Sequence, residues 1–343
     1  MVNEHFIKFL LPDRSYQALV RAEIKKLAET IGFKDHRLGE VEIIIAEITT
    51  NLIKHTTKGG MILVRQISKP DFGLELIAID DGPGMKSPLK MLEDGHSTAK
   101  TLGMGLGAIK RLSDAFDIFS LQGWGSVVYS KIYINRASEA VNEQFDVAVL
   151  SIARKDQSVC GDAWAFSTNG KKVRIALVDG LGHGEFANDA AMLAVDNFMQ
   201  DQKATPVEQL RSMHETIKKT RGAVATVVYA DERNSQMTYS GVGNISMKVI
   251  SALQNHSCYS YNGIVGHIMP VSLNDHFFQW NSKSDIIVMH SDGLSSRWDV
   301  QKYPGILTKK SLVLCAALFK DFDRGNDDTT ILVARNLLNV NRN

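Results

Sequence analysis

The sequence has few cysteines and no long apolar run. Only three cysteines occur in 343 residues, Cys160, Cys258 and Cys315, and they form no Cys-x-x-Cys pair. A disulfide framework is therefore excluded, and we expect a reducing compartment. The longest apolar run, 312–319, is far shorter than the roughly 20 residues that a membrane span needs. Charged residues interrupt the N-terminal segment, so we expect no signal peptide and a soluble cytoplasmic protein without a membrane partner.

An excess of charge of either sign is also missing. The chain has 39 Lys and Arg against 38 Asp and Glu, and its formal net charge is +1. Residues 1–136 contain 18 basic and 16 acidic residues, and the remainder contains 21 and 22. This balance excludes proteins that hold nucleic acid or membranes by bulk electrostatics. The length predicts about two domains at roughly 150 residues each.

The first part of the chain alternates helical and strand-like patterns. Apolar residues recur at spacings of three and four between Leu38 and Leu52, which predicts one apolar helix face. We therefore expect an α/β sandwich of about 135 residues, built on the usual periodicities. The expected helices cover 14–31, 36–57 and about 105–116, and the expected strands cover 61–67, 74–79, 117–121 and 127–134.

A polar stretch separates this part from a β-rich second part. Many short strands around a central pair of helices indicate a β-sandwich flanked by helices, so the whole chain is expected to be α+β. We expect domains at 1–136 and 145–343, joined by a linker at 137–144. The expected strands cover 147–153, 163–167, 173–178, 223–230, 237–241, 247–250, 286–290 and 330–334, and the expected helices cover about 185–200, 206–220 and 308–319.

Glu47, Asn51 and His55 lie four residues apart on one predicted helix. This spacing gives a polar stripe beside the apolar face, because four residues advance a helix by slightly more than one turn. Carboxylate and amide oxygens in such a stripe suit Mg²⁺. The pattern also fits a plain solvated helix face.

Two glycine-rich segments follow the stripe. Asp80-Asp81-Gly82-Pro83-Gly84 ends an apolar strand, where the acid could accept a hydrogen bond from a base amino group, or the residues could form a simple turn. The second segment opens a predicted helix, and exposed amides at a helix N-terminus suit phosphate. It consists of Gly103, Met104, Gly105, Leu106 and Gly107, preceded by Lys100 and Thr101, which could add a charge and a hydroxyl.

The order of these motifs, followed by Gly125-Ser126 on a late strand, resembles the Bergerat-fold ATP-binding family (GHKL) over residues 5–135. Residues 101–118 resemble most the small switch serine kinases of the RsbT and RsbW type. The resemblance implies that Glu47 is the general base for a Ser or Thr hydroxyl and that Asn51 holds the Mg²⁺ of ATP. It implies that Asp80 binds adenine. The remaining implied ATP-binding residues are His55, Gly82, Gly84, Lys100, Thr101, Gly103, Met104, Gly105, Leu106, Gly107 and Ser126.

Four aspartates in the second part lie at strand boundaries beside glycine or another small residue. They are Asp162, Asp179, Asp292 and Asp327. Each Asp-Gly alone fits a β-turn. Carboxylates that converge at one edge of a sandwich repel one another, and a pair of divalent metals such as Mg²⁺ or Mn²⁺ offsets that repulsion.

The segment VDGLGHG around Asp179 resembles the metal-dependent protein phosphatase family (PPM), in its bacterial SpoIIE and RsbX branch, over residues 145–336. The resemblance implies an α-β-β-α sandwich. It also implies two Mn²⁺ or Mg²⁺ ions held by the four aspartates and the Gly180 carbonyl. His183 could donate a proton to the leaving group, or it could orient the loop or cap the following helix. Asp328 could hold a weaker third metal or fix the turn.

Together, the two resemblances imply a bifunctional bacterial partner-switching regulator of the stress-response kind. It would phosphorylate and dephosphorylate Ser or Thr on a STAS-domain partner, with a further regulator released by the switch. The alternative is a phosphatase whose N-terminal domain is only a binding module, which captures a sigma factor or a STAS protein, or an ATP sensor. Switch kinases of this type often pair, so a homodimer is also expected.

Overall fold

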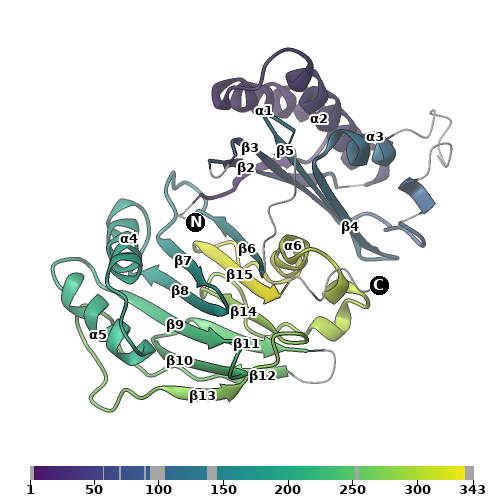
Figure 1. Cartoon of the computed structure of the whole chain (residues 1–343). Helices are drawn as coiled ribbons and strands as arrows, with labels where there is room; N and C mark the ends of the chain where they lie inside the picture. The colour runs from purple at the N-terminus through teal and green to yellow at the C-terminus, as the bar shows by residue number, and fades with distance from the viewer. Residues whose placement is uncertain are drawn as a thin grey trace. The chain divides into compact units, whose positions relative to one another are not determined.

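The computed structural model describes residues 4–56, 58–68, 71–88, 90–92, 105–136, 145–251 and 255–336 (Figure 1). Contacts between residues divide the chain into two compact units. The N-terminal unit comprises Phe6–Asn142 and Val300–Lys320. The C-terminal unit comprises Met1–His5, Glu143–Asp299 and Asp321–Asn343. The predicted linker, 137–144, lies outside the described residues.

The N-terminal unit is built on a five-stranded antiparallel sheet with the strand order β1-β2-β3-β5-β4. Three helices cover one face of this sheet (Figure 1). The strands are β1 (Ile7–Leu11), β2 (Gly60–Ile67), β3 (Gly73–Asp80), β4 (Ala115–Leu121) and β5 (Gly125–Tyr133), and the helices are α1 (Gln17–Ile31), α2 (Asp35–His55) and α3 (Gly105–Leu112).

Helix α2 forms its apolar face as its periodicity predicts. Four residues of this face are buried: Val41, Ile45, Ile48 and Leu52. Leu38 is partly exposed and packs against the same core. Alternate residues of the strands supply the opposite side of this core, because side chains at every second position of a strand share a face. Burial of these side chains fixes α2 on the sheet and thereby sets the direction of its polar stripe.

A segment from late in the chain, Val300–Lys320, belongs to the N-terminal unit. It contains most of α6 (Ser311–Phe322), whose residues from Ser311 to Phe319 are all buried. A helix that is apolar all round has no face for solvent. The carboxylate of Asp117 on β4 accepts a hydrogen bond from the Lys310 amide (2.7 Å), so it satisfies a free amide where the helix begins.

The C-terminal unit contains two five-stranded antiparallel sheets, of orders β13-β10-β9-β8-β7 and β12-β11-β14-β15-β6. Side chains from both sheets form one core between them, as in a β-sandwich. The strands of the first sheet are β7 (Asp162–Asn169), β8 (Lys172–Gly180), β9 (Ala223–Asp231), β10 (Gln236–Val242) and β13 (His276–Gln279). Those of the second are β6 (Phe145–Ile152), β11 (Ser246–Ile250), β12 (Asn255–Cys258), β14 (Ile286–His290) and β15 (Thr329–Asn336).

Helices α4 (Glu185–Gln200) and α5 (Pro206–Thr216) cover the outer face of the first sheet (Figure 1). Their contact surface is rich in buried alanine, for example Ala163 on β7 and Ala191 on α4. Small side chains let a helix approach a sheet closely. The close approach holds the start of α4 against the end of β8, where the predicted metal loop lies.

The expected α+β class is confirmed, and the element boundaries differ in a few places. Helix α3 ends at Leu112 rather than near residue 116, because the Asp114 amide already donates to the Lys131 carbonyl of β5 (2.8 Å). Helix α5 ends at Thr216 rather than at 220. Strands β1, β12 and β13 have no clear alternation and were not expected. No helix within the described ranges is long and apolar enough to cross a membrane.

Candidate nucleotide and metal sites

The polar stripe of α2 faces the start of α3. Glu47 and Asn51 are half-buried, and His55 is exposed at the end of the helix. Gly105, the first residue of α3, is so close that an added Cβ atom would lie 3.0 Å from Glu47 Oε2 and 3.6 Å from Asn51 Oδ1. The structure therefore brings these three predicted residues together. A base, an amide oxygen and a helix N-terminus in contact suit the phosphates and Mg²⁺ of a nucleotide.

Helix α3 covers Gly105–Leu112, and residues 93–104 lie outside the described residues. Gly107 is buried, and Leu106 packs against the core of the N-terminal unit. Four predicted ATP-binding residues lie outside the described residues: Lys100, Thr101, Gly103 and Met104.

The second nucleotide motif is a tight loop at the end of β3. Asp80 is the register partner of Ser126 on β5, and its Oδ1 accepts a hydrogen bond from the Gly82 amide (2.7 Å). Burial raises the Asp80 pKa above its ordinary value. Gly84 has φ +68°, and an added Cβ would lie 1.8 Å from the Leu121 carbonyl oxygen, so only glycine fits there. The loop thus holds a half-buried acid beside Ser126.

The neighbouring acid, Asp81, forms an ion pair with Lys320 of α6 within the N-terminal unit. Lys320 is buried and Asp81 is largely exposed, and the Lys320 Nζ atom lies 4.6 Å from the centroid of the Trp124 ring. The late segment therefore contacts the loop that carries Asp80. Sequence reasoning did not predict this contact, because the two residues are 239 positions apart.

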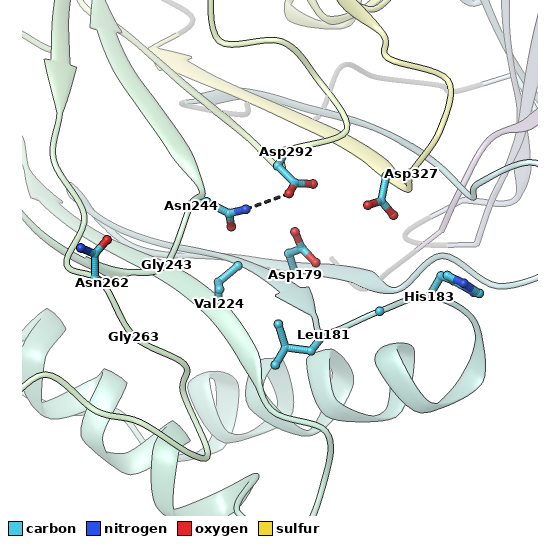
Figure 2. Close-up of a pocket in the computed structure, with 11 residues that line it drawn as sticks. Asp179, Leu181, His183, Val224, Gly243, Asn244, Asn262, Gly263, Asp292 and Asp327 are labelled. Carbon is cyan, nitrogen blue, oxygen red and sulfur yellow. Dashed lines mark hydrogen bonds between the residues drawn. The ribbon is translucent and has the colours of Figure 1, made fainter.

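A cavity of about 360 Å³ in the C-terminal unit lies beside three of the predicted metal ligands. Asp179, Asp292 and Asp327 line it together with Asn244 and His183. Figure 2 shows that the carboxylates of Asp179 and Asp292 point toward one another, whereas the His183 ring points away. The three aspartates come from the ends of β8 and β14 and from the loop before β15. Strand ends separated in sequence thus converge, as the motif spacing predicts.

The fourth aspartate, Asp162, begins β7 and is the register partner of Asp179. It is 1% exposed. Its Oδ2 accepts a hydrogen bond from the Ser291 hydroxyl (2.7 Å), and its Oδ1 has no hydrogen-bond partner among the described residues. Burial raises the Asp162 pKa to about 7. A buried carboxylate oxygen without a partner is costly, and a cation offsets that cost.

Asp179 has the same electrostatic environment. Burial raises its pKa well above the ordinary value, and the charges of Asp162, Asp292 and Asp327 raise it further. Across the described ranges, no three His, Cys, Asp or Glu side chains are grouped tightly enough to hold a metal ion. The carboxylates would therefore have to close on an ion, and their oxygen-only donor set fits Mg²⁺ or Mn²⁺.

The remaining predicted residues take different places. Gly180 packs against α4, where an added Cβ would lie 2.0 Å from the Ala187 carbonyl oxygen. Asp328 accepts hydrogen bonds from the amides of Arg154 (2.6 Å) and Gly161 (2.8 Å), so it fixes the loops around the cavity. The residue that caps α4 is Gly184, so His183, which is exposed, does not cap that helix.

Comparison with known proteins identifies both parts of the chain. Residues 11–129 match the histidine kinase-like ATPase domain family, and residues 169–336 match the Stage II sporulation protein E (SpoIIE) family. The chain is 33% identical to the Bacillus subtilis serine/threonine-protein kinase RsbT over 104 residues, which are 30% of this chain and 78% of that protein. The chain belongs to the histidine kinase-like ATPase family and carries a second, SpoIIE-type domain.

The SpoIIE-type domain has relatives of its own. It is similar to the Bacillus subtilis phosphoserine phosphatase RsbX, with 27% identity over 157 residues, which are 45% of this chain and 77% of that protein. The chain also resembles a chain from a solved structure described as "The bacterial stressosome: a modular system that has been adapted to control secondary messenger signaling". That likeness has a TM-score of 0.52 and 27% identity, and it covers 56% of this chain and all of the other.

Two residues of the SpoIIE-type domain that sequence reasoning missed support the aspartates. The Asn244 side-chain amide donates to Asp292 Oδ2 (2.8 Å). The Ser291 hydroxyl binds Asp162 and accepts from the Thr330 amide (2.9 Å), so it joins β7 to β15. Asn244 comes after β10 and next to Gly243, and Ser291 comes directly after β14 and next to Asp292. That pattern is the one signal that could have identified them.

Proposed function

We propose that this chain phosphorylates and dephosphorylates a serine or threonine of a STAS-domain partner protein. Residues 1–136 would carry the ATP-dependent kinase, and residues 145–343 would carry the metal-dependent phosphatase. The observation that supports the phosphatase is the buried Asp162 Oδ1, which has no hydrogen-bond partner among the described residues and lies near three half-buried aspartates that line a cavity. The observation that supports the kinase is the contact of Gly105 with Glu47 and Asn51.

In the phosphatase, the proposed metal ligands are Asp162, Asp179, the Gly180 carbonyl, Asp292 and Asp327. Two Mn²⁺ or Mg²⁺ ions would supply Lewis acidity at the phosphoryl group and activate a water molecule. The chain itself supplies the frame, because Ser291 holds Asp162 and Asn244 holds Asp292. The hydrogen bonds to Asp328 keep the surrounding loops in register.

In the kinase, Glu47 would accept the proton of the partner's hydroxyl group while that oxygen bonds to the γ-phosphorus of ATP and ADP leaves. Asn51 would hold Mg²⁺, which neutralises the phosphates, and Asp80 would bind the adenine amino group. Such catalysis depends mainly on positioning and charge neutralisation. The other proposed ATP-binding residues are His55, Gly82, Gly84, Lys100, Thr101, Gly103, Met104, Gly105, Leu106, Gly107 and Ser126.

The relatives support a single partner for both activities. RsbT is described as a serine/threonine-protein kinase and RsbX as a phosphoserine phosphatase, and both belong to one organism. Their counterparts in one chain would act on the same phosphorylated residue. A STAS-domain protein that binds a further regulator only in one phosphorylation state completes a partner switch.

Transfer of labelled phosphate from ATP to a STAS-domain protein tests the kinase. With Mg²⁺ present, we expect label on the partner with the full chain, and a loss of about 10²-fold or more with Glu47→Gln. Glu42→Gln, a partly exposed residue of the same helix that pairs with Lys25, is the matched control and should keep full activity. If no label transfers under any metal condition, the N-terminal domain is a binding module or ATP sensor.

Release of phosphate from the phosphorylated partner tests the phosphatase. Asp179→Asn should reduce release by about 10²- to 10³-fold, the scale found when one group that stabilises charge in a transition state is removed. Asp196→Asn, on the exposed side of α4, is the matched control. Undiminished release by Asp179→Asn would show that the aspartates do not form the active site.

A further inference from the structure

A positively charged side chain, that of Arg221, lies beside a loop of the acidic cavity. Arg221 is in the turn between α5 and β9, and it lies beside Gly182, which lines the cavity with Asp179 and Asp292. A Cβ atom added to Gly182 would lie 3.0 Å from Arg221 Nη1. The guanidinium group is therefore in contact with the cavity loop and, being exposed, is open to a ligand.

The turn that carries Arg221 is fixed to the loop that follows Asp179. The Leu181 amide donates to the Gly222 carbonyl (3.0 Å), and the Gly222 amide donates to the Thr220 hydroxyl (3.1 Å). Gly222 has φ +79°, and an added Cβ would lie 2.8 Å from the Val265 carbonyl oxygen. Only glycine fits this position, and the hydrogen bond from Leu181 ties the turn to the cavity loop.

The Arg221 side chain rests on an aromatic ring rather than on an acid. Its guanidinium carbon lies 5.0 Å from the centroid of the Phe186 ring, and the Phe186 side chain is 65% exposed. Within the described part of the chain, no carboxylate forms an ion pair with Arg221. Stacking on an aromatic face orients the guanidinium plane and leaves its N–H groups free to donate.

The charge of the cavity indicates a role for Arg221 in binding phosphate. The negative charges of four aspartates would cancel the positive charges of two divalent metal ions. The loaded site would then have little positive charge left for a phosphomonoester dianion. A guanidinium group presents N–H donors in a planar fork that fits two phosphate oxygens. We propose that Arg221 binds the phosphoryl group of the phosphorylated serine or threonine at the mouth of the cavity. This inference rests on the proposed phosphatase function.

The test compares Arg221→Gln with the full-length wild type, both loaded with Mn²⁺. Titration calorimetry with inorganic phosphate should show binding about 10- to 100-fold weaker in the variant, which is the usual effect of losing a hydrogen bond between charged groups. The KM for the phosphorylated partner should rise by a similar factor. Arg221→Lys should recover only part of the affinity, because lysine lacks the planar fork.

Two controls separate phosphate binding from other effects. Arg211→Gln, an exposed arginine on α5, should bind phosphate as the wild type does. The Mn²⁺ affinity of Arg221→Gln, measured by electron paramagnetic resonance, should equal that of the wild type. If Arg221→Gln keeps wild-type phosphate affinity and KM, Arg221 is only a solvated side chain and the assignment is wrong. If the wild type itself binds no Mn²⁺ and releases no phosphate, the phosphatase function fails first and the assignment fails with it.

Discussion

Both units bury carboxylates, but they surround them with opposite charges. In the N-terminal unit, Glu75 of β3 lies between Arg65 and Lys131, its register partners on β2 and β5. In the C-terminal unit, Asp162 and Asp179 lie among other acids. Burial by itself favours a higher pKa for each of these three acids, and for Asp162 and Asp179 the pKa is raised. For Glu75, the charges of Arg65 and Lys131 and hydrogen bonds from Arg65 and Tyr129 outweigh burial, so its pKa is lowered.

This difference separates a structural acid from one that we propose to be a metal ligand. The Tyr129 hydroxyl and the Arg65 Nε donate to the two oxygens of Glu75 (2.9 and 3.1 Å), so both oxygens have partners inside the protein. In the part of the chain that the structure describes, Asp162 Oδ1 has no hydrogen-bond partner. A buried acid with its own cations completes the fold, whereas a cluster of acids without cations indicates a site that takes its cations from solution.

The largest effect that tests this comparison is expected at Glu75. Glu75→Gln removes the buried charge that pairs with the half-buried Arg65, and it should lower the free energy of unfolding by about 3 kcal/mol. Urea unfolding of the full chain measures this loss. Glu42→Gln removes an exposed partner of Lys25 and should cause no measurable change. A loss at Glu75 no greater than the control would mean that the buried cluster does not stabilise the unit.

The next effect is the response to metal. Mn²⁺ at about 100 times its dissociation constant should stabilise the wild type by about 2.7 kcal/mol, because the ion binds only the folded site. Asp179→Asn should lose most of this stabilisation, and Glu75→Gln should retain it. Thermal unfolding with and without Mn²⁺ gives both values. Equal stabilisation of Asp179→Asn and the wild type would place the ion elsewhere.

A smaller effect, a gain in stability rather than a loss, is expected when Asp162 is changed in the metal-free protein. Asp162→Asn removes one of several charges that repel one another, so metal-free protein should become more stable, by about 1 kcal/mol. The same thermal unfolding experiment, in the presence of a chelator, measures it. Destabilisation by this variant would mean that the Ser291 hydrogen bond to Asp162 contributes more than the repulsion removes.

The smallest effect is the pH dependence of the Glu75 contribution. The Glu75 pKa in the folded protein lies below its ordinary value of 4.5, so its stabilisation is complete above that pH and is lost as the pH falls through the lowered pKa. The difference in unfolding free energy between the wild type and Glu75→Gln should therefore shrink below pH 4.5. A difference that stays constant to pH 3 would show that the ion pair is not its source.

The fold was predictable where apolar periodicity is strong. The positions of the candidate site residues were predictable where motifs end strands. The face of α2 and the Asp-Gly ends of β8 and β14 follow from spacing alone. Strands β12 and β13 were not predictable, because four residues with little alternation carry no signal of their own. The membership of Val300–Lys320 in the N-terminal unit was not predictable either, since it depends on contacts such as that between Asp117 and Lys310.

The residues that support the sites left only a weak signal in the sequence, as polar residues that follow strands. Ser291 and Asn244 act through hydrogen bonds to aspartates that are 129 and 48 positions away. Serine and asparagine are common in loops, so neither residue type is informative until the strands are paired. The opposite surroundings of Glu75 and Asp162 likewise depend on register, which places Arg65 beside one acid and Asp179 beside the other.

The most direct test of the central claim is anomalous X-ray scattering at the manganese edge, from crystals of the full chain grown with Mn²⁺. We predict anomalous peaks within ligand distance of Asp162, Asp179, Asp292 and Asp327, and none beside Glu75. Peaks confined to other positions, or the absence of any peak among the four aspartates, would contradict the claim that this cluster takes its cations from solution.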